Sequence, residues 1–237
     1  MSYPLPKNET KRLEALHRYG LLDTPPEQSF DDFAFLASHI CGTPIGFVSL
    51  VDSDRQWLKA QVGGAPIEVP REQSFCSYAM LAGDVMIVED ATQDVRFSQN
   101  PLVTGKENIR FYAGAPLVDR DGYQLGALCA IGHEPQHLSE EQKTALEALA
   151  RQVMVQMEYR QTSYELAQAL ADVKRLSGML PICGHCKNIR DDEGYWKSVE
   201  DYISNHSAVG FSHGICPSCI QSQYPEMYQL LQAKGKM

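Results

Sequence analysis

The feature that most constrains the fold of this sequence is segment 107–132, which has the pattern of a β-hairpin. Two apolar runs, 109–118 and 123–131, flank the pair Asp121-Gly122. Such a pair is typical of a tight hairpin turn, because glycine readily adopts the positive φ that the turn needs. Most positions in both runs are apolar, so we expect both faces of these strands to be covered. The hairpin therefore predicts the centre of a sheet between two layers, and its aromatic residues beside an Arg make it a candidate pocket floor.

The segments before the hairpin predict a mixed fold. The expected elements are helices at 8–19, 30–40 and 74–81 and strands at 45–51, 56–62 and 86–89, assigned from apolar periodicity and from Gly and Pro breaks. The segment 94–105 is expected to be a loop or a short helix. This order favours a sandwich of helices on a mostly antiparallel sheet.

A long helix is expected after the hairpin. Ser139 and Gln142 have the spacing of a capping box, and neither Gly nor Pro follows until Gly178. A helix of about 40 residues exceeds the width of a domain. Apolar residues recur near the 3.5-residue spacing of a coiled coil, although 160–163 breaks the register; they are Leu166, Ala169, Val173, Leu176 and Leu180. The spacing favours a homodimer formed through this helix, and the alternative is one helix packed on its own domain.

Four of the seven cysteines form two C-x2-C pairs near the C-terminus. The pairs are Cys183 with Cys186 and Cys216 with Cys219, and 29 residues separate them. Two such pairs can complete a tetrahedron of thiolates around one ion, and four thiolates favour zinc. We therefore predict one structural Zn²⁺ held by these four residues. A redox dithiol and an iron or iron–sulfur site are the alternatives.

Composition argues against several classes of partner. The formal net charge is −9, and residues 181–237 hold five Lys and Arg against six Asp and Glu. Binding to nucleic acid or to an anionic membrane needs clustered positive charge, so neither is expected. No apolar run approaches the length of about 18 residues that a membrane span needs. The first residues lack the apolar stretch of a signal peptide, so we expect a cytoplasmic protein.

Several residues of the first 132 are candidates for ligand binding. Arg96 and Arg110 each precede a Phe, and a guanidinium held against an aromatic ring can bind an anion or a carbonyl group. Asp90 and Asp94 could pair with these arginines, and the alternative to ligand binding is a structural salt bridge that pins the loop 90–105. The aromatic residues could equally be core. The full candidate set is Phe75, Cys76, Asp90, Arg96, Phe97, Arg110, Phe111, Tyr112 and Cys129.

Residues 8–157 resemble the bacterial GAF sensory domain. Four strings carry the resemblance: LDTP at 22–25, SFC at 74–76, EDATQDVRFSQNPLVTG at 89–105 with IRFYAGAPL at 109–117, and LGALC at 125–129. The resemblance implies an α+β fold in which a central antiparallel sheet has helices on one face and a ligand cavity on the other. It also implies terminal helices that form a dimeric bundle. The C-terminal CxxC and CPxC strings look like a cysteine-rich tail of some bacterial sensory proteins.

Together these observations predict three parts and a signalling role. They are a GAF sensory domain at 1–157, a connecting coiled-coil-like helix at 158–180 and a zinc-binding module at 181–237. The expected function is to sense an unidentified small molecule in the GAF pocket and to relay its binding to the zinc module and a protein partner. No catalytic motif is recognised, and enzymatic activity is left open.

Two other functions remain open. Some GAF proteins reduce free methionine sulfoxide with pocket cysteines, so Cys76 and Cys129 are alternative catalytic residues of a thiol redox enzyme or sensor. Both could instead be small buried hydrophobic residues. A structural adaptor without a ligand is the second alternative.

Overall fold

The chain forms two compact units, residues 1–168 and 169–237. The computed structural model describes residues 4–177, 180–191, 193–206 and 210–233, although the side chains of 172–177 and 233 are not described. Helix α5 (Glu140–Ser177) begins in the first unit and continues into the second. The expected helix end near 179 and the side chains of Val173 and Leu176 lie outside the described residues.

The first unit is built on a six-stranded sheet. Its strands pair antiparallel, as the order of the elements predicted. The strand order is β3-β2-β1-β6-β5-β4. The bounds are β1 Ile45–Val51, β2 Arg55–Val62, β3 Glu68–Pro70, β4 Met86–Val88, β5 Phe111–Val118 and β6 Gln124–Gly132. The strand β3, which pairs with the edge of β2, was not expected from the sequence. The central position of β5 and β6 explains why their residues are almost all buried.

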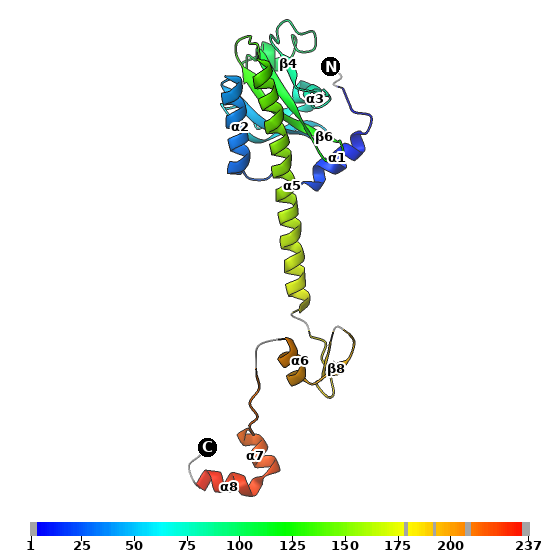
Figure 1. The fold of residues 1–237 in the computed structure, drawn as a ribbon, viewed down its shortest axis with the longest axis vertical. Helices are drawn as coiled ribbons and strands as arrows, with labels where there is room; N and C mark the ends of the chain where they lie inside the picture. The colour runs from blue at the N-terminus through cyan, green and yellow to red at the C-terminus, as the bar shows by residue number, and fades with distance from the viewer. Residues whose placement is uncertain (1–3, 178–179, 192, 207–209, 234–237) are drawn as a thin grey trace. The chain divides into compact units, whose positions relative to one another are not determined.

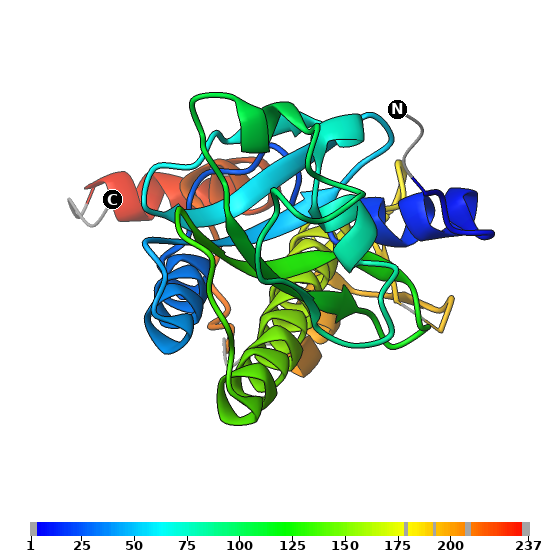
Figure 2. The ribbon, with the colours of Figure 1, turned by 90° about the horizontal axis from the view of Figure 1, so that it is seen from above.

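Helices lie on both faces of the sheet. One face carries α1 (Glu9–Arg18), α2 (Gln28–Cys41) and the first part of α5, and Figures 1 and 2 show α2 and α5 side by side. The other face carries the short helices α3 (Cys76–Ala79) and α4 (Pro101–Thr104) with their connecting loops. Successive residues of β5 alternate between the two layers: Phe111 and Ala113 face α2 and α5, whereas Tyr112 faces α3.

Local interactions hold the hairpin and the start of α5. The Asp119 carboxylate accepts the backbone N–H groups of Asp121 and Tyr123, and Gly122 has a φ of 85°. The Ser139 hydroxyl accepts the N–H of Gln142, whose side chain in turn accepts the N–H of Ser139. The capping box predicted from the sequence is therefore confirmed.

Two networks around buried cations fix the N-terminal segment, and sequence patterns did not indicate them. The Lys59 ammonium donates to the Thr24 hydroxyl, the Pro25 carbonyl and the Glu27 carboxylate. The Glu9 carboxylate accepts from both Arg12 and Arg71, whose side chains are fully buried. The LDTP string thus has a structural use, because its Thr and Pro hold a buried lysine.

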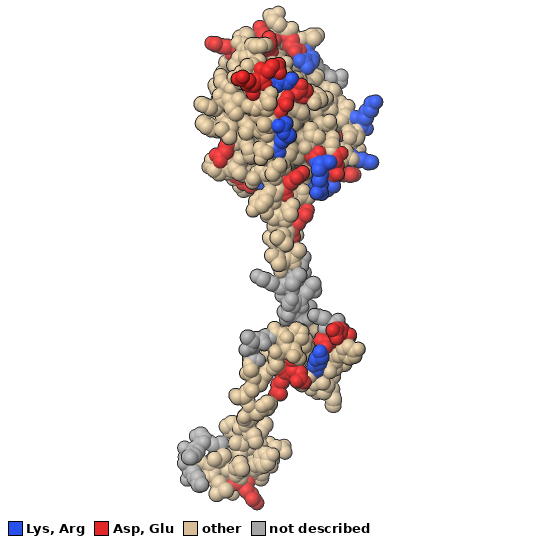
Figure 3. Space-filling view, in the orientation of Figure 1, with Lys and Arg blue, Asp and Glu red and all other residues tan. Residues whose placement is uncertain are grey.

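The second unit contains short elements after α5. A two-stranded sheet pairs β7 (Ile189–Arg190) with β8 (Trp196–Lys197), and α6 (Val199–His206), α7 (Pro217–Gln223) and α8 (Pro225–Ala233) follow. Within the described ranges, no helix is both long and apolar enough to span a membrane. On the face drawn in Figure 3, acidic and basic side chains are interspersed over the first unit.

Candidate functional site

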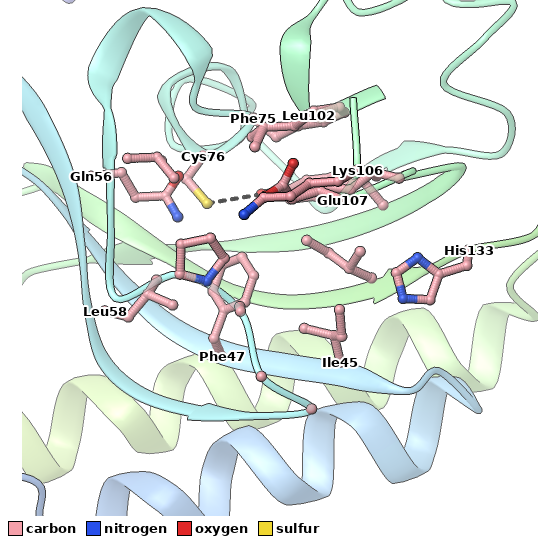
Figure 4. A pocket seen from close by; sticks show the side chains of 18 residues that line it. Ile45, Phe47, Gln56, Leu58, Phe75, Cys76, Leu102, Lys106, Glu107 and His133 are labelled. Atoms are coloured by element: carbon pink, nitrogen blue, oxygen red, sulfur yellow. Dashed lines mark hydrogen bonds and ion pairs between the residues drawn. The ribbon is translucent and has the colours of Figure 1, made fainter. Parts of the chain in front are cut away.

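A cavity of about 190 Å³ lies on the sheet face opposite α2 and α5. Figure 4 shows its lining side chains between the strands and the segments that cover them. Its apolar lining includes Ile45, Phe47, Leu58, Val69, Phe75, Leu102, Ile109 and Ile131. The loop 63–66, which follows β2, closes one side. A mainly apolar concave space with a few polar groups is the usual form of a small-molecule site.

Two thiols and a phenol lie together at one wall of this cavity. The Sγ atoms of Cys76 and Cys129 are 3.4 Å apart. The Tyr112 hydroxyl donates to Cys76 Sγ at 3.4 Å and lies 3.1 Å from Cys129 Sγ. All three residues are fully buried, and Cys76 and Tyr112 are among the cavity-lining residues. Strands β5 and β6 position Tyr112 and Cys129, and α3 brings Cys76 over them.

The three groups have unequal acidities. Burial and the neighbouring sulfurs raise the pKa of Tyr112 well above its usual value. Burial and Cys76 likewise raise the pKa of Cys129. Burial also disfavours the Cys76 thiolate, but hydrogen bonds from Cys129, Ser49 and Tyr112 outweigh that effect and lower the pKa of Cys76. Cys76 is therefore the group of the three that ionises first.

Polar groups occur at two other places in the lining. Gln56 accepts from the Ser74 hydroxyl at 2.5 Å, and this bond anchors the segment before α3. Lys106, Glu107 and His133 supply charged and titratable groups elsewhere in the lining. The cavity can thus contact a small molecule through an apolar body and a few polar ends.

The structure places only part of the expected ligand-binding set in this cavity. Phe75, Cys76 and Tyr112 line it, and Cys129 contacts two of them. Phe97 lies behind Phe75, with the two rings stacked at 4.0 Å. It contributes to the core cluster beneath the cavity and is not itself a lining residue.

The remaining expected residues have structural contacts elsewhere. Arg96 pairs with Asp94 and stacks on Phe97, while Asp90 accepts from Thr92. Arg110 donates to the carbonyls of residues 103 and 109, which pins the segment around α4. Phe111 is on the opposite face of the sheet because neighbouring strand residues alternate. These four do not line the cavity, and the salt-bridge interpretation of Arg96 describes its contacts better than ligand binding.

Comparison with known proteins assigns the first unit to a family. The GAF domain family matches residues 25–157, more than half of the chain. The chain belongs to the GAF domain family. It is 41% identical over 163 residues to a cyclic di-GMP phosphodiesterase of Pseudomonas aeruginosa, an alignment that covers 68% of this chain. The chain spans only 28% of that relative's length.

Solved structures similar to the GAF domain come from proteins of several kinds. The GAF domain of an Acinetobacter phosphoenolpyruvate-protein phosphotransferase has a TM-score of 0.48 at 17% identity, covering 65% of this chain and 95% of that one. A bacteriophytochrome of R. palustris has a TM-score of 0.49 at 17% identity, and the match covers 74% of this chain and 42% of that one. A free methionine-R-sulfoxide reductase of Neisseria meningitidis has a TM-score of 0.48 at 18% identity, and the match covers 69% of this chain and 98% of that one.

Sequence reasoning missed most of the GAF cavity's apolar lining. Ile45 and Phe47 are two residues apart on β1 and face the same side, and Leu58 lies on the adjacent β2. The period-two pattern of these strands assigns residues to faces. It does not say which face borders a cavity, because that depends on what covers the strand.

The two cysteine pairs of the second unit occupy different local structures. Cys183 begins a tight turn in which the Lys187 N–H donates to the Cys183 carbonyl, and Lys187 has a φ of 65°. Cys216 precedes the first residue of α7, with Cys219 in its first turn. Backbone N–H groups of Cys186 and His185 lower the pKa of Cys183, and the Ser218 hydroxyl and the Cys219 N–H lower that of Cys216 to about 7. In the described residues, no three potential metal ligands come together.

Membership in the GAF family, with this cavity on one face of the sheet, fits a sensor or signalling function. The antiparallel GAF fold and the long helix expected from the sequence are both confirmed.

Proposed function

We propose that this chain is a signalling protein whose GAF cavity binds a small molecule and whose long helix passes the binding event to a zinc-holding C-terminal module. One observation supports this relay above the others. Strand β6 has Cys129 and Ile131 on the cavity side, and Leu128 and Ala130 in the core shared with α5. A ligand that shifts this strand acts on the packing of α5 through adjacent residues.

The cavity favours a compact ligand with an apolar body. Its volume of about 190 Å³ is close to that of an engineered cavity of about 150 Å³ that holds benzene. A cyclic dinucleotide is much larger, so the ligand differs from the substrate named for the Pseudomonas relative. That relative instead supports a place for this GAF domain in bacterial signal transduction.

The exposed surface of α5 supports a parallel homodimer. Val155, Tyr159 and Leu166 are 56%, 68% and 60% exposed, although all three are large and apolar. Together with the exposed Thr162 and Ala169 they alternate spacings of four and three residues. This is the a/d pattern of a coiled coil, and it is self-complementary in a symmetric pair. Two packings of this seam would provide the two states that a ligand can shift.

The turns that hold the cysteine pairs support the zinc proposal. Each pair presents two thiols from one short turn, and thiolates are the donors that zinc favours. Cys183 and Cys186 would supply one half of the ligand set, and Cys216 and Cys219 the other. Zinc would act structurally by joining the two pairs. Metal binding would then be coupled to the folding of residues 181–237.

Native mass spectrometry of the purified full chain tests the sensory proposal. We expect a co-purifying small molecule, or binding of indole added as a probe of suitable size. The variant Ala65→Trp places a large ring in the cavity lining and should abolish binding. The control Ile67→Trp lies two residues away at an exposed position that does not line this cavity, and should retain it.

The relay is tested by hydrogen exchange of α5. Ligand or indole should change amide exchange in residues 158–171 of the wild type and of Ile67→Trp, but not of Ala65→Trp. A chain that binds no small molecule in either measurement, or binds one without any change in α5, would contradict the proposed function.

A further inference from the structure

The Cys76–Cys129 pair has a geometry that core packing alone does not require. The two residues are 53 positions apart in the sequence, yet their sulfurs lie 3.4 Å apart with one phenol hydroxyl contacting both. Cys41 provides the contrast within the same unit. It is equally buried, has no hydrogen bond to its sulfur in the described structure, and burial alone raises its pKa to about 11.

The pair also borders the cavity, although the Cys76 side chain is itself fully buried, so a small solute reaches its sulfur when the side chains at this wall move. Cys76 lines the cavity, whereas Cys129 lies behind it and contacts Cys76 through its sulfur. A molecule of the size of hydrogen peroxide is little larger than water and fits a cavity of about 190 Å³. The thiol that such a molecule meets is Cys76, and the thiol that can react next is Cys129.

We propose that Cys76 and Cys129 form a reversible disulfide when a hydroperoxide enters the GAF cavity. The Cys76 thiolate attacks one oxygen of hydrogen peroxide, and the O–O bond breaks. This step converts Cys76 to a sulfenic acid and releases hydroxide. The Cys129 sulfur then attacks the Cys76 sulfur, so the S–S bond forms and the S–O bond of the sulfenic acid breaks. The departing hydroxide takes the thiol proton of Cys129 and leaves as water. In sum two thiols and one H₂O₂ give one disulfide and two waters, and an external dithiol restores both thiols.

Tyr112 has a positioning role in this step. Its hydroxyl donates to Cys76 Sγ, which favours the thiolate that attacks the peroxide. The new bond would tie α3 to β6 and convert the two thiols that contact this hydroxyl into a disulfide. Any effect of the disulfide on α5 rests on the relay proposed above, because β6 is the strand shared by the two cores. The chemical step itself does not depend on that relay.

Peptide mapping of the full chain tests the proposal. The reduced protein is treated with hydrogen peroxide, free thiols are alkylated after denaturation, and the protein is digested with trypsin without reductant. Cys76 lies in peptide 72–96 and Cys129 in peptide 121–143. We expect these two peptides to be joined, two hydrogens lighter than their sum, and separated again by dithiothreitol. The peptide with Cys41 should remain alkylated.

Variants make the test specific. Tyr112→Phe keeps both sulfurs but removes one hydrogen bond, so oxidation should slow roughly five-fold, the effect of about 1 kcal/mol. Ala65→Trp should slow oxidation by filling the cavity, whereas Ile67→Trp should not. The proposal is overturned if Cys76 and Cys129 both stay alkylated at a peroxide dose that oxidises Cys183 and Cys186 in the same sample. Equal rates in Ala65→Trp and the wild type would also overturn it.

These outcomes are independent of the sensory proposal. A linked peptide with no ligand binding and no response in α5 would support the disulfide and contradict the relay. Ligand binding and a response in α5 without the linked peptide would support the relay and contradict the disulfide.

Discussion

At the scale of single residues, buried charge holds the N-terminal helix to the sheet. Arg12 and Arg71 are fully buried, and one carboxylate, that of Glu9, accepts from both. These hydrogen bonds overcome the effect of burial and lower the pKa of Glu9 from 4.5 to about 2. The Glu9 carboxylate therefore stabilises both buried cations, and Arg71 also donates to the Asp52 carbonyl.

Replacing this carboxylate should destabilise the fold. We expect Glu9→Gln to lower the free energy of unfolding by roughly 2 kcal/mol, less than for a fully buried pair because the Glu9 side chain is 20% exposed. Glu14→Gln, an exposed position on the same helix, is the control and should change little. Urea denaturation followed by circular dichroism measures both.

The same residue predicts a pH dependence with a definite sign. The pKa of Glu9 is lower in the folded state, so its stabilisation is complete above about pH 4.5 and is lost as the pH falls toward 2. The difference in unfolding free energy between wild type and Glu9→Gln should therefore shrink over that window. A difference that stays constant from pH 6 to 3 would show that Glu9 does not act as the buried anion.

A second residue-scale prediction concerns a close approach between strands. A Cβ atom added at Gly126 would lie 2.0 Å from the Ser49 carbonyl oxygen, a backbone atom that cannot move without disturbing β1. Gly126→Ala should destabilise the domain by about 3 kcal/mol or more. Gly83→Ala meets nothing within 4 Å and serves as the control. A melting temperature for Gly126→Ala equal to that of the control would contradict this packing.

At the scale of elements, α5 has two different surfaces. Leu146, Val153 and Met157 are buried in the core of the first unit, whereas Val155, Tyr159 and Leu166 are exposed. The five seam positions, 155, 159, 162, 166 and 169, carry no charged residue. An uncharged seam with heptad spacing is suited to a second helix of the same kind.

The dimer is tested by placing one charge in this seam. Leu166→Lys would bring two like charges together in a parallel dimer, so we expect the sedimentation coefficient to shift from dimer toward monomer. Ala171→Lys, exposed and nearly opposite on the helical wheel, carries the same change and should leave the dimer intact. If the wild type sediments as a monomer, or both variants behave alike, this seam does not form the interface.

At the scale of the whole molecule, two units of different chemistry share one helix. The first unit is held by an apolar core on each face of the sheet. The described part of the second unit contains few buried residues, with Ile189 and Asp191 as examples. A unit with so small an apolar core gains most from a metal that joins its ends.

Metal analysis of the purified chain tests this expectation. We expect about one zinc per chain by mass spectrometry of the digested sample, following the Cys₄ stoichiometry. Cys183→Ser and Cys219→Ser should each lose the metal, and hydrogen exchange of 181–233 should then accelerate. The control Cys41→Ala changes a buried cysteine of the first unit and should retain the zinc. Stoichiometric iron in place of zinc, or no metal at all, would contradict the proposed module.

Elements whose signals are local could be predicted from the amino-acid sequence. The Asp-Gly turn, the mainly apolar runs of β1, β2, β5 and β6, and the capping box at Ser139 each depend on neighbouring residues only. Their positions match the structure to within about two residues. The apolar residues along both hairpin strands also indicated correctly that these strands lie between two layers, where almost all of their residues are buried.

The residues that border the cavity, and the pairs that contact each other across the fold, could not be predicted in this way. Tyr112 faces the cavity and Phe111 the helices because the strands are covered differently on their two faces, a fact that no local pattern contains. Arg110 binds nearby carbonyls, Lys59 binds the LDTP segment, and Cys76 meets Cys129 across 53 residues. Such partners are set by distances between segments far apart in the chain, and these distances exist only once the layers have packed.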